Sequence, residues 1–275
     1  MDDGAAEVPM RRTIDVRLDY WVAAPALIEV QAAVATGQDT TDEALSVSLD
    51  GVDLEVEALA DDMGNRHHLV RAQSGQLVVQ YGVVVHGRVA APVTTPLDPL
   101  VLTRPSRYCE ADRLAGFAAS EFRGLTEAAD LLPAVSSWVG DRLEYVPGSS
   151  GPTDGAVNTL LERRGVCRDY AHLTVALLRA CGVPSRVVAV YAPGLWPMDF
   201  HAVVEAIVDG VWRVVDPTLL APRSSLVRIA TGRDAADTAF LTSYGGQLFP
   251  NLIEVGAVVD PYLPTDDVTE LLSLG

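Results

Sequence analysis

Three residues in the second half of this chain have the side-chain types of a nucleophile, a base and a group that orients the base. Cys167 follows Gly165-Val166 and precedes a stretch with apolar residues on one face, so we expect it to begin a helix. A thiol at that place meets the positive end of the helix dipole, which favours the nucleophilic thiolate. A lone cysteine is more often a small packing residue, so a reactive site needs partners.

A predicted β-hairpin supplies these partners. Asp209-Gly210 separates two apolar segments and is a preferred two-residue hairpin loop. With this loop Val203 lies opposite Asp216, and His201 becomes a diagonal neighbour of Asp216 on the same face, with Cα atoms about 7–8 Å apart. A slip of one residue would separate the two side chains. The pattern therefore predicts a thiol nucleophile, Cys167, with His201 as its base and Asp216 orienting the imidazole.

The other cysteines and histidines are interpreted as structural. Cys109 and Cys181 are expected to be packing thiols, because free cysteines are usually buried. His67-His68 is expected in a solvated turn, since no tetrahedral ligand set accompanies it. His172 lies five residues after the nucleophile and points about 140° away from it on a helix. We therefore predict no metal, and the thiol chemistry needs no organic cofactor.

The elements that position these residues differ between the two halves of the chain. Residues 11–90 contain short Val- and Leu-rich segments separated by turn residues, which is typical of a sandwich or small barrel. Residues 91–103 carry three prolines and are expected to be a linker. Residues 104–275 are expected to form an α+β catalytic domain, and residues 1–10 a disordered N-terminus.

Within the catalytic region, helical periodicity is followed by strands. Pro133 is expected to break one helix. The apolar side chains of the hairpin, including Val203 and Val214, are expected to pack on the helix that begins at Cys167. Asp199, two residues before His201, is expected to be an exposed turn residue.

Composition restricts the partners. The 275 residues include 20 basic and 37 acidic side chains, a net charge of −17, which argues against binding to nucleic acid or to an anionic membrane. Three cysteines cannot make a disulfide framework. The first residues lack the apolar segment of a secretory signal, and no run reaches the ~20 apolar residues of a membrane span. We expect a cytoplasmic protein; a homo-oligomer is left open.

Three motifs resemble those of the transglutaminase-like superfamily. The stretch Gly165-Val166-Cys167-Arg168-Asp169-Tyr170-Ala171-His172 resembles its nucleophile motif, and Met198-Asp199-Phe200-His201-Ala202 and Val215-Asp216-Pro217-Thr218 resemble its His and Asp segments in the same order. The similarity covers roughly residues 104–245, and the β-rich region before Pro92 resembles the N-terminal domain of bacterial members. The resemblance implies a papain-like catalytic core preceded by a β-sandwich-like domain.

The resemblance also implies acyl transfer at a peptide or protein amide through a thioester. Cys167 would attack the carbonyl, His201 would move the proton, and Asp216 would hold the imidazole. We favour hydrolysis over transfer to an amine, because water is always available and no amine-binding feature is evident. Two alternatives remain: an acyltransferase that uses a thioester donor, like the arylamine acetyltransferases, and a non-catalytic peptide-binding scaffold. The backbone amide of Cys167 is one candidate oxyanion donor, and the sequence assigns no second donor.

Overall fold

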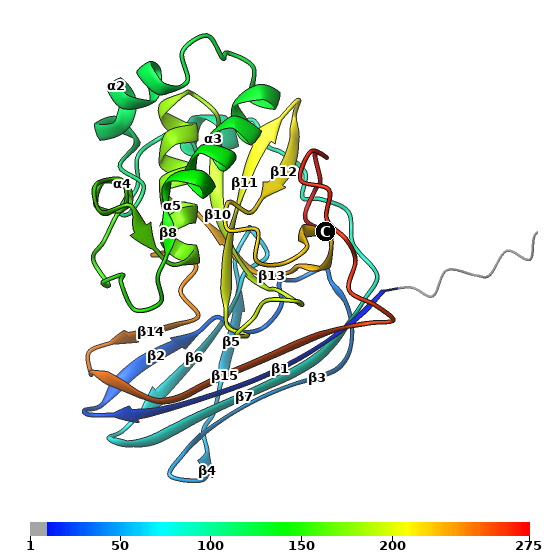
Figure 1. Ribbon diagram of the computed structural model, residues 1–275. Coiled ribbons are helices and arrows are strands. Elements are labelled where there is room, and N and C mark those ends of the chain that lie inside the picture. The colour runs from blue at the N-terminus through cyan, green and yellow to red at the C-terminus, as the bar shows by residue number, and fades with distance from the viewer. Residues whose placement is uncertain (1–9) are drawn as a thin grey trace, which may run out of the picture.

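The computed structural model describes residues 10–275, so the predicted disordered segment, residues 1–10, lies outside the described residues except for Met10. Two β-sheets stack on each other, and a region of helices around a third sheet stands on them (Figure 1). This is the mixed α+β architecture that the sequence predicts.

The strands form three main sheets and one short parallel pair. The five-stranded sheet has the order β15-β1-β7-β3-β4, formed by Leu248–Asp260, Arg11–Val22, Gly75–His86, Asp39–Leu49 and Val52–Asp53. The second sheet has the order β14-β2-β6-β5, formed by Leu241–Tyr244, Ala26–Val30, Arg66–Ala72 and Glu57–Ala60. The third has the order β12-β11-β10-β13, formed by Val211–Val215, His201–Val208, Ser185–Tyr191 and Val227–Gly232. The short pair consists of β8 (Glu144–Tyr145) and β9 (Arg164–Gly165).

The five α-helices precede the third sheet in the chain, and one short 3₁₀ helix lies between its strands β12 and β13. They are α1 (Asp98–Val101), α2 (Ala111–Glu121), α3 (Ala128–Arg142), α4 (Ala156–Glu162), α5 (Cys167–Ala180) and the short 3₁₀ helix η1 (Arg223–Ser225). None of the helices in residues 10–275 is long and apolar enough to cross a membrane.

The sandwich forms because its strands alternate apolar and polar residues. In β1 the side chains of Ile14, Val16 and Leu18 are buried, whereas Asp15 faces outward. Apolar residues of both sheets meet between them in one core. The same alternation explains an incorrect prediction: His67-His68 lies in β6 rather than in a solvated turn, and His68 is buried together with every second residue of the strand.

Two strands of the sandwich come from the C-terminal part of the chain. β14 pairs with β2, and β15 pairs with β1 along its whole length. Both lie within residues 104–275, which the sequence assigned to the catalytic domain. Their partners are more than 200 residues earlier in the chain, so no local pattern could indicate the pairing.

Helix α5 is the centre of the helical region. Every residue from Asp169 to Arg179 is buried, because α5 packs against α2, α3, α4 and the strands β10 and β11. The expected break at Pro133 is absent, because α3 runs through this residue. Leu132 and Val135 on either side of the proline are buried against α5 and its neighbours, and this packing compensates for the lost backbone hydrogen bond.

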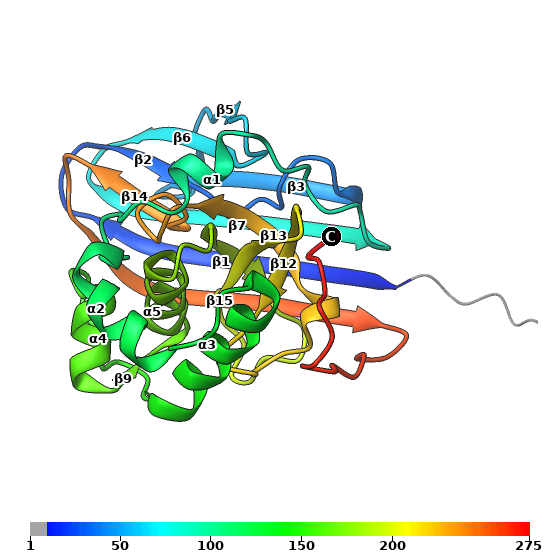
Figure 2. The ribbon, with the colours of Figure 1, turned by 90° about the horizontal axis from the view of Figure 1, so that it is seen from above.

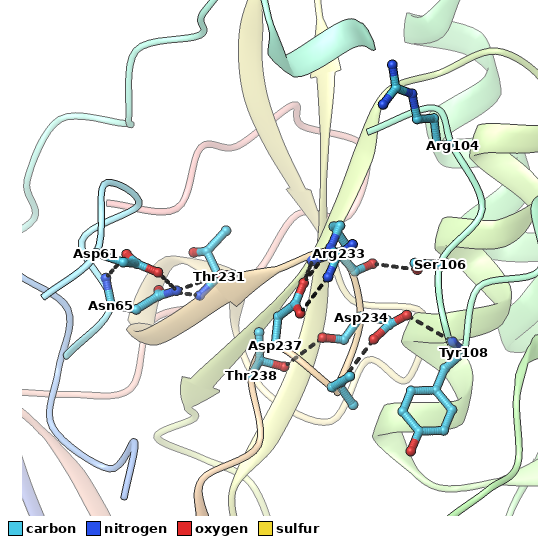
Figure 3. A network of polar contacts seen from close by, with 12 residues as sticks. Asp61, Asn65, Arg104, Ser106, Tyr108, Thr231, Arg233, Asp234, Asp237 and Thr238 are labelled. Atoms are coloured by element: carbon cyan, nitrogen blue, oxygen red, sulfur yellow. Dashed lines mark hydrogen bonds and ion pairs between the residues drawn. The ribbon is translucent and has the colours of Figure 1, made fainter. Parts of the chain in front are cut away.

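The sandwich and the third sheet share one core and are tied by polar contacts. Tyr191 and Ile229 of the third sheet lie in the same apolar cluster as the sandwich residues. The buried amide of Asn65 bridges to β13, donating to the carbonyl of Thr231 (2.8 Å) and accepting from its N–H (2.7 Å), as Figure 3 shows. On the other side of β13, the backbone N–H of Tyr108 donates to Asp234 at 2.9 Å and joins the helical region to the third sheet (Figure 3). These contacts hold the sandwich and the catalytic region in a fixed relative position.

Candidate active site

The first residue of α5 is Cys167, and the turn before it is held by polar contacts. Oδ2 of buried Asp169 accepts the backbone N–H of Val166 at 2.8 Å, and Oδ1 accepts the hydroxyl of Ser150 at 2.8 Å. A Cβ on Gly165 would come within 2.6 Å of the Asp169 side chain, so only glycine fits there. The sulfur is therefore placed at the positive end of a well-fixed helix, as the sequence predicts.

The hairpin β11–β12 has the predicted register. Val204 lies opposite Val215, and Asp209-Gly210 forms the turn. The register places Nε2 of His201 2.8 Å from Oδ2 of Asp216. Both side chains are buried, and the prediction that this register brings them together is confirmed.

Asp216 is held by its own neighbours. Its Oδ1 accepts the N–H of Thr218 at 2.9 Å and the hydroxyl of Thr218 at 2.7 Å. Burial alone would raise the pKa of Asp216, but the charge of His201 and the hydrogen bonds from His201 and Thr218 outweigh it and lower the pKa. The carboxylate is therefore ionised and oriented.

The imidazole of His201 lies between the carboxylate and the thiol. Burial disfavours its charged form, yet Asp216 and the neighbouring Cys167 together raise the pKa of His201 to about 10. Nε2 binds Asp216, whereas Nδ1 is buried and has no hydrogen-bond partner within residues 10–275, so it is the nitrogen left to exchange a proton with the sulfur of Cys167. A positive imidazolium beside the sulfur attracts the nucleophilic thiolate.

The predicted packing of the hairpin on α5 is wrong in one respect. Val203 and Val214 pack with Leu226 in a separate apolar cluster, whereas Val204 and Val215, on the opposite face, pack against α5. The thiol and the imidazole still meet, because Cys167 begins α5 and His201 begins β11. They come together at the ends of their elements rather than across the packed face.

Tyr145 is a member of the site that sequence reasoning missed. β8 pairs with β9 so that Tyr145 lies beside Gly165, two residues before the nucleophile. Its hydroxyl lies near the backbone N–H and the side chain of Cys167. Burial, together with the negative charges of Cys167 and Asp199, raises the pKa of Tyr145 to about 12, so the hydroxyl keeps its proton at neutral pH. A two-residue parallel pair has no sequence pattern that could have revealed this contact.

Asp199 is exposed in the loop before β11, as predicted, but it also faces the site. One of its carboxylate oxygens accepts the N–H of Phe200 at 2.7 Å. Its charge acts on His201, on Tyr145 and on Tyr20 of the sandwich. Partial burial raises the pKa of Asp199. In its ionised form the carboxylate adds negative charge to the site from the side of the sandwich.

The remaining candidates have packing roles. Cys109 is buried, and burial raises the pKa of its thiol well above the ordinary value. Burial also raises the pKa of Cys181. His172 is buried, stacks on Tyr108 and accepts the N–H of Ala235 at 3.1 Å, and burial lowers its pKa to about 3. Within residues 10–275 no cluster of three or more His, Cys, Asp or Glu side chains is arranged to hold a metal ion.

Known proteins resemble both the sequence and the fold. A family model of the transglutaminase-like superfamily matches residues 116–217, a range that contains Cys167, His201 and Asp216. A crystal structure of a candidate cysteine protease from Cytophaga hutchinsonii superposes with a TM-score of 0.86 and 30% sequence identity, over 98% of this chain and 96% of that chain. The chain belongs to the transglutaminase-like superfamily. An uncharacterized protein of Mycobacterium leprae is 29% identical over 157 residues, which are 52% of this chain and 55% of that protein.

A second curated relative, an uncharacterized protein of Mycobacterium tuberculosis, is 30% identical over 105 residues, or 38% of this chain and 31% of that protein. The matches therefore span about half and about a third of these two curated relatives. The membership of this chain in the transglutaminase-like superfamily supports a thiol enzyme in general terms.

Proposed function

We propose that this protein is a thiol-dependent enzyme that cleaves or transfers at an amide bond of a peptide or protein through a thioester. The observation that carries the proposal is the buried imidazole of His201, bound to Asp216 through Nε2 and adjacent to the sulfur of Cys167. In this arrangement the sulfur forms a bond to the substrate carbonyl carbon. His201 then protonates the leaving amine as the C–N bond breaks.

The tetrahedral intermediate needs donors for its oxyanion. The Cys167 backbone N–H at the start of α5 is one donor. Tyr145 is the second in this proposal, because its protonated hydroxyl lies near that N–H and near the sulfur. A substrate oxygen that enters between them would accept from the N–H and from the hydroxyl. His201, neutral after it has protonated the amine, then takes a proton from the water that attacks the thioester carbonyl. The C–S bond breaks, the carboxylic acid product leaves, and the thiolate is again beside the imidazolium of His201.

Two measurements test this function. Iodoacetamide at neutral pH should alkylate Cys167 much faster than Cys109 or Cys181, because only Cys167 has an imidazolium neighbour. A casein-type substrate, incubated with and without a primary amine, should be cleaved more than it is labelled with the amine, and Cys167→Ala should abolish both reactions. Equal, slow alkylation of the three thiols without turnover would instead support a peptide-binding scaffold, and dominant amine incorporation would make the protein a transferase.

We further propose that the preferred substrates carry a positive charge close to the scissile amide. Asp199 places a carboxylate beside the reacting groups, and the whole chain carries a charge of −17, which attracts cations over a longer range. Methanethiosulfonate reagents with a cationic or an anionic tail test this charge without any amidase assay. In a Cys181→Ala background the cationic reagent should modify Cys167 faster, and Asp199→Asn should lower the cation-to-anion rate ratio about 3- to 10-fold.

Asp209→Asn is the matched control for this experiment. Asp209 lies in the turn at the far end of β11, about 26 Å along the strand from His201. Its positive φ of 51° is a conformation that asparagine tolerates. The ratio should stay unchanged in this variant. If both substitutions lower the ratio equally, the effect comes from net charge, and Asp199 has no specific role.

A further inference from the structure

The strand β15 is a long, free edge. It pairs with β1 on one side, and residues 10–275 contain no strand that pairs with its other side. Figure 2 shows β15 at one margin of the five-stranded sheet. At the opposite margin of the sheet, β4 covers only Ser48 and Leu49 of β3, whose open part carries the charges of Asp39, Asp42 and Glu43. β15 has 13 residues, whereas the other strands that end the three main sheets have from two to six: β4, β5, β14, β12 and β13. A row of unpaired N–H and C=O groups of this length is a template for another strand.

The usual means of blocking an edge are concentrated in the first part of β15. Pro250 lies at a register irregularity opposite Tyr20, and proline cannot donate to a ladder. Residues 252–259 contain no proline and one charged residue, Glu254. Large apolar side chains are exposed along this part: Leu252 is 38% exposed, Ile253 40% and Val258 62%. This second part of β15 is both free to pair and apolar.

We propose that β15 pairs antiparallel with β15 of a second copy of this chain, joining two five-stranded sheets into one. Two copies of an apolar strand can pair with each other if the register places no two like charges directly opposite. A two-fold axis perpendicular to an antiparallel pair passes between directly opposite residues, so one residue must face its own copy. The central residue therefore determines which residues of the two copies lie opposite each other.

Charge and proline select the central residue. If Glu254 were central, it would face Glu254 of the second copy, and if Ala257 were central, Glu254 would face Asp260; like charges in direct opposition are destabilising. Centres at Val255 or before Glu254 bring Pro250 into the ladder, and centres beyond Ala257 shorten it. Gly256 remains. With Gly256 central, residues 252–260 pair without a proline, and Glu254 faces Val258.

Cysteine cross-linking tests this register directly. Directly opposite Cα atoms are about 4.5–5.5 Å apart, within the range that a disulfide spans. A Cβ at Gly256 would meet Asp15 only at ordinary contact distances of 3.5 and 3.7 Å, so the backbone leaves room for the Cβ of Gly256→Cys. In a Cys167→Ser background, mild oxidation should link two Gly256→Cys chains covalently. Glu254→Cys is the control, because its two copies would be offset by about 13 Å and should not link.

Sedimentation of the full chain over a wide concentration range supplies the second test. The wild-type protein should dimerise, and added salt should tighten the dimer by screening the repulsion between two chains of charge −17. Val258→Glu places two like-charge pairs against Glu254 and should raise the dimer Kd about 2- to 30-fold. Val258→Lys places opposite charges there and should not raise it. Val52→Glu, on β4 at the other edge of the same sheet, should have no effect.

The outcomes that overturn the proposal are specific. A monomer at every concentration and salt level excludes the dimer. A dimer that both Val258 substitutions weaken equally, or that Glu254→Cys links as well as Gly256→Cys, excludes the register centred on Gly256. A complex in which β15 pairs with a different protein, while the chain alone stays monomeric, assigns the edge to another partner. None of these tests depends on the proposed enzymatic function.

Discussion

His201→Ala is expected to lower amide turnover by at least roughly 10³-fold, because it removes the group that takes the thiol proton and returns it to the leaving amine. The same variant should alkylate more slowly at Cys167. Without an imidazolium neighbour, a thiol is only a few per cent thiolate at pH 7. Its alkylation rate at neutral pH should then fall well below the wild-type rate.

Two further variants separate loss of chemistry from loss of folding. Asp216→Asn keeps the shape of the side chain but cannot hold the charged imidazole, so turnover should fall strongly while the thiol remains present. His86→Ala removes a histidine at the end of β7, away from the site, and should leave turnover and alkylation unchanged. Circular dichroism should show the same folded signal for all three variants. Full turnover by His201→Ala would exclude the proposed base.

Tyr145→Phe is expected to lower turnover about 10²- to 10³-fold, the usual cost of removing one oxyanion donor. It should leave iodoacetamide alkylation of Cys167 nearly unchanged, because that displacement at carbon develops no oxyanion. A lower turnover with an unchanged alkylation rate would identify Tyr145 as an oxyanion donor. A merely structural role for Tyr145 would change both rates together or neither.

The control for Tyr145 uses the tyrosine that its ring approaches. Tyr170→Phe removes a buried hydroxyl that donates to the carbonyl of Leu143 at 2.8 Å, so it should lower the free energy of unfolding by about 1 kcal/mol and leave turnover per folded molecule unchanged. If Tyr145→Phe slows alkylation as much as turnover, its hydroxyl acts on the thiol rather than on the oxyanion.

The parts of the site that the sequence predicts are those with local signals. The Asp209-Gly210 turn sets the register of β11 and β12, and this register brings His201 to Asp216. Cys167 begins α5, as the apolar spacing of the residues that follow it predicts. Each of these relations spans few residues, so spacing alone suffices to predict it.

The parts that sequence reasoning missed depend on contacts between distant segments. Tyr145 reaches Cys167 through a two-residue parallel pair with no periodicity of its own. The alternation of side chains along the strands did not show that α5 covers the face of the hairpin that carries Val204, because both faces of the hairpin are apolar. Likewise β15 reads as an apolar segment, and only its partner β1 shows that it belongs to the sandwich.

The pairing of β1 with β15 has a consequence for the order in which the molecule assembles. Arg11 pairs with Asp260 and Val22 with Leu248, so the first described strand gains this neighbour only after more than 200 further residues have been synthesised. During translation β1 can pair with β7, but its other edge has to wait for the ribosome to release the C-terminal strand. Such non-local pairing slows folding. A nascent chain halted before residue 248 therefore exposes the strand edge that β15 later covers.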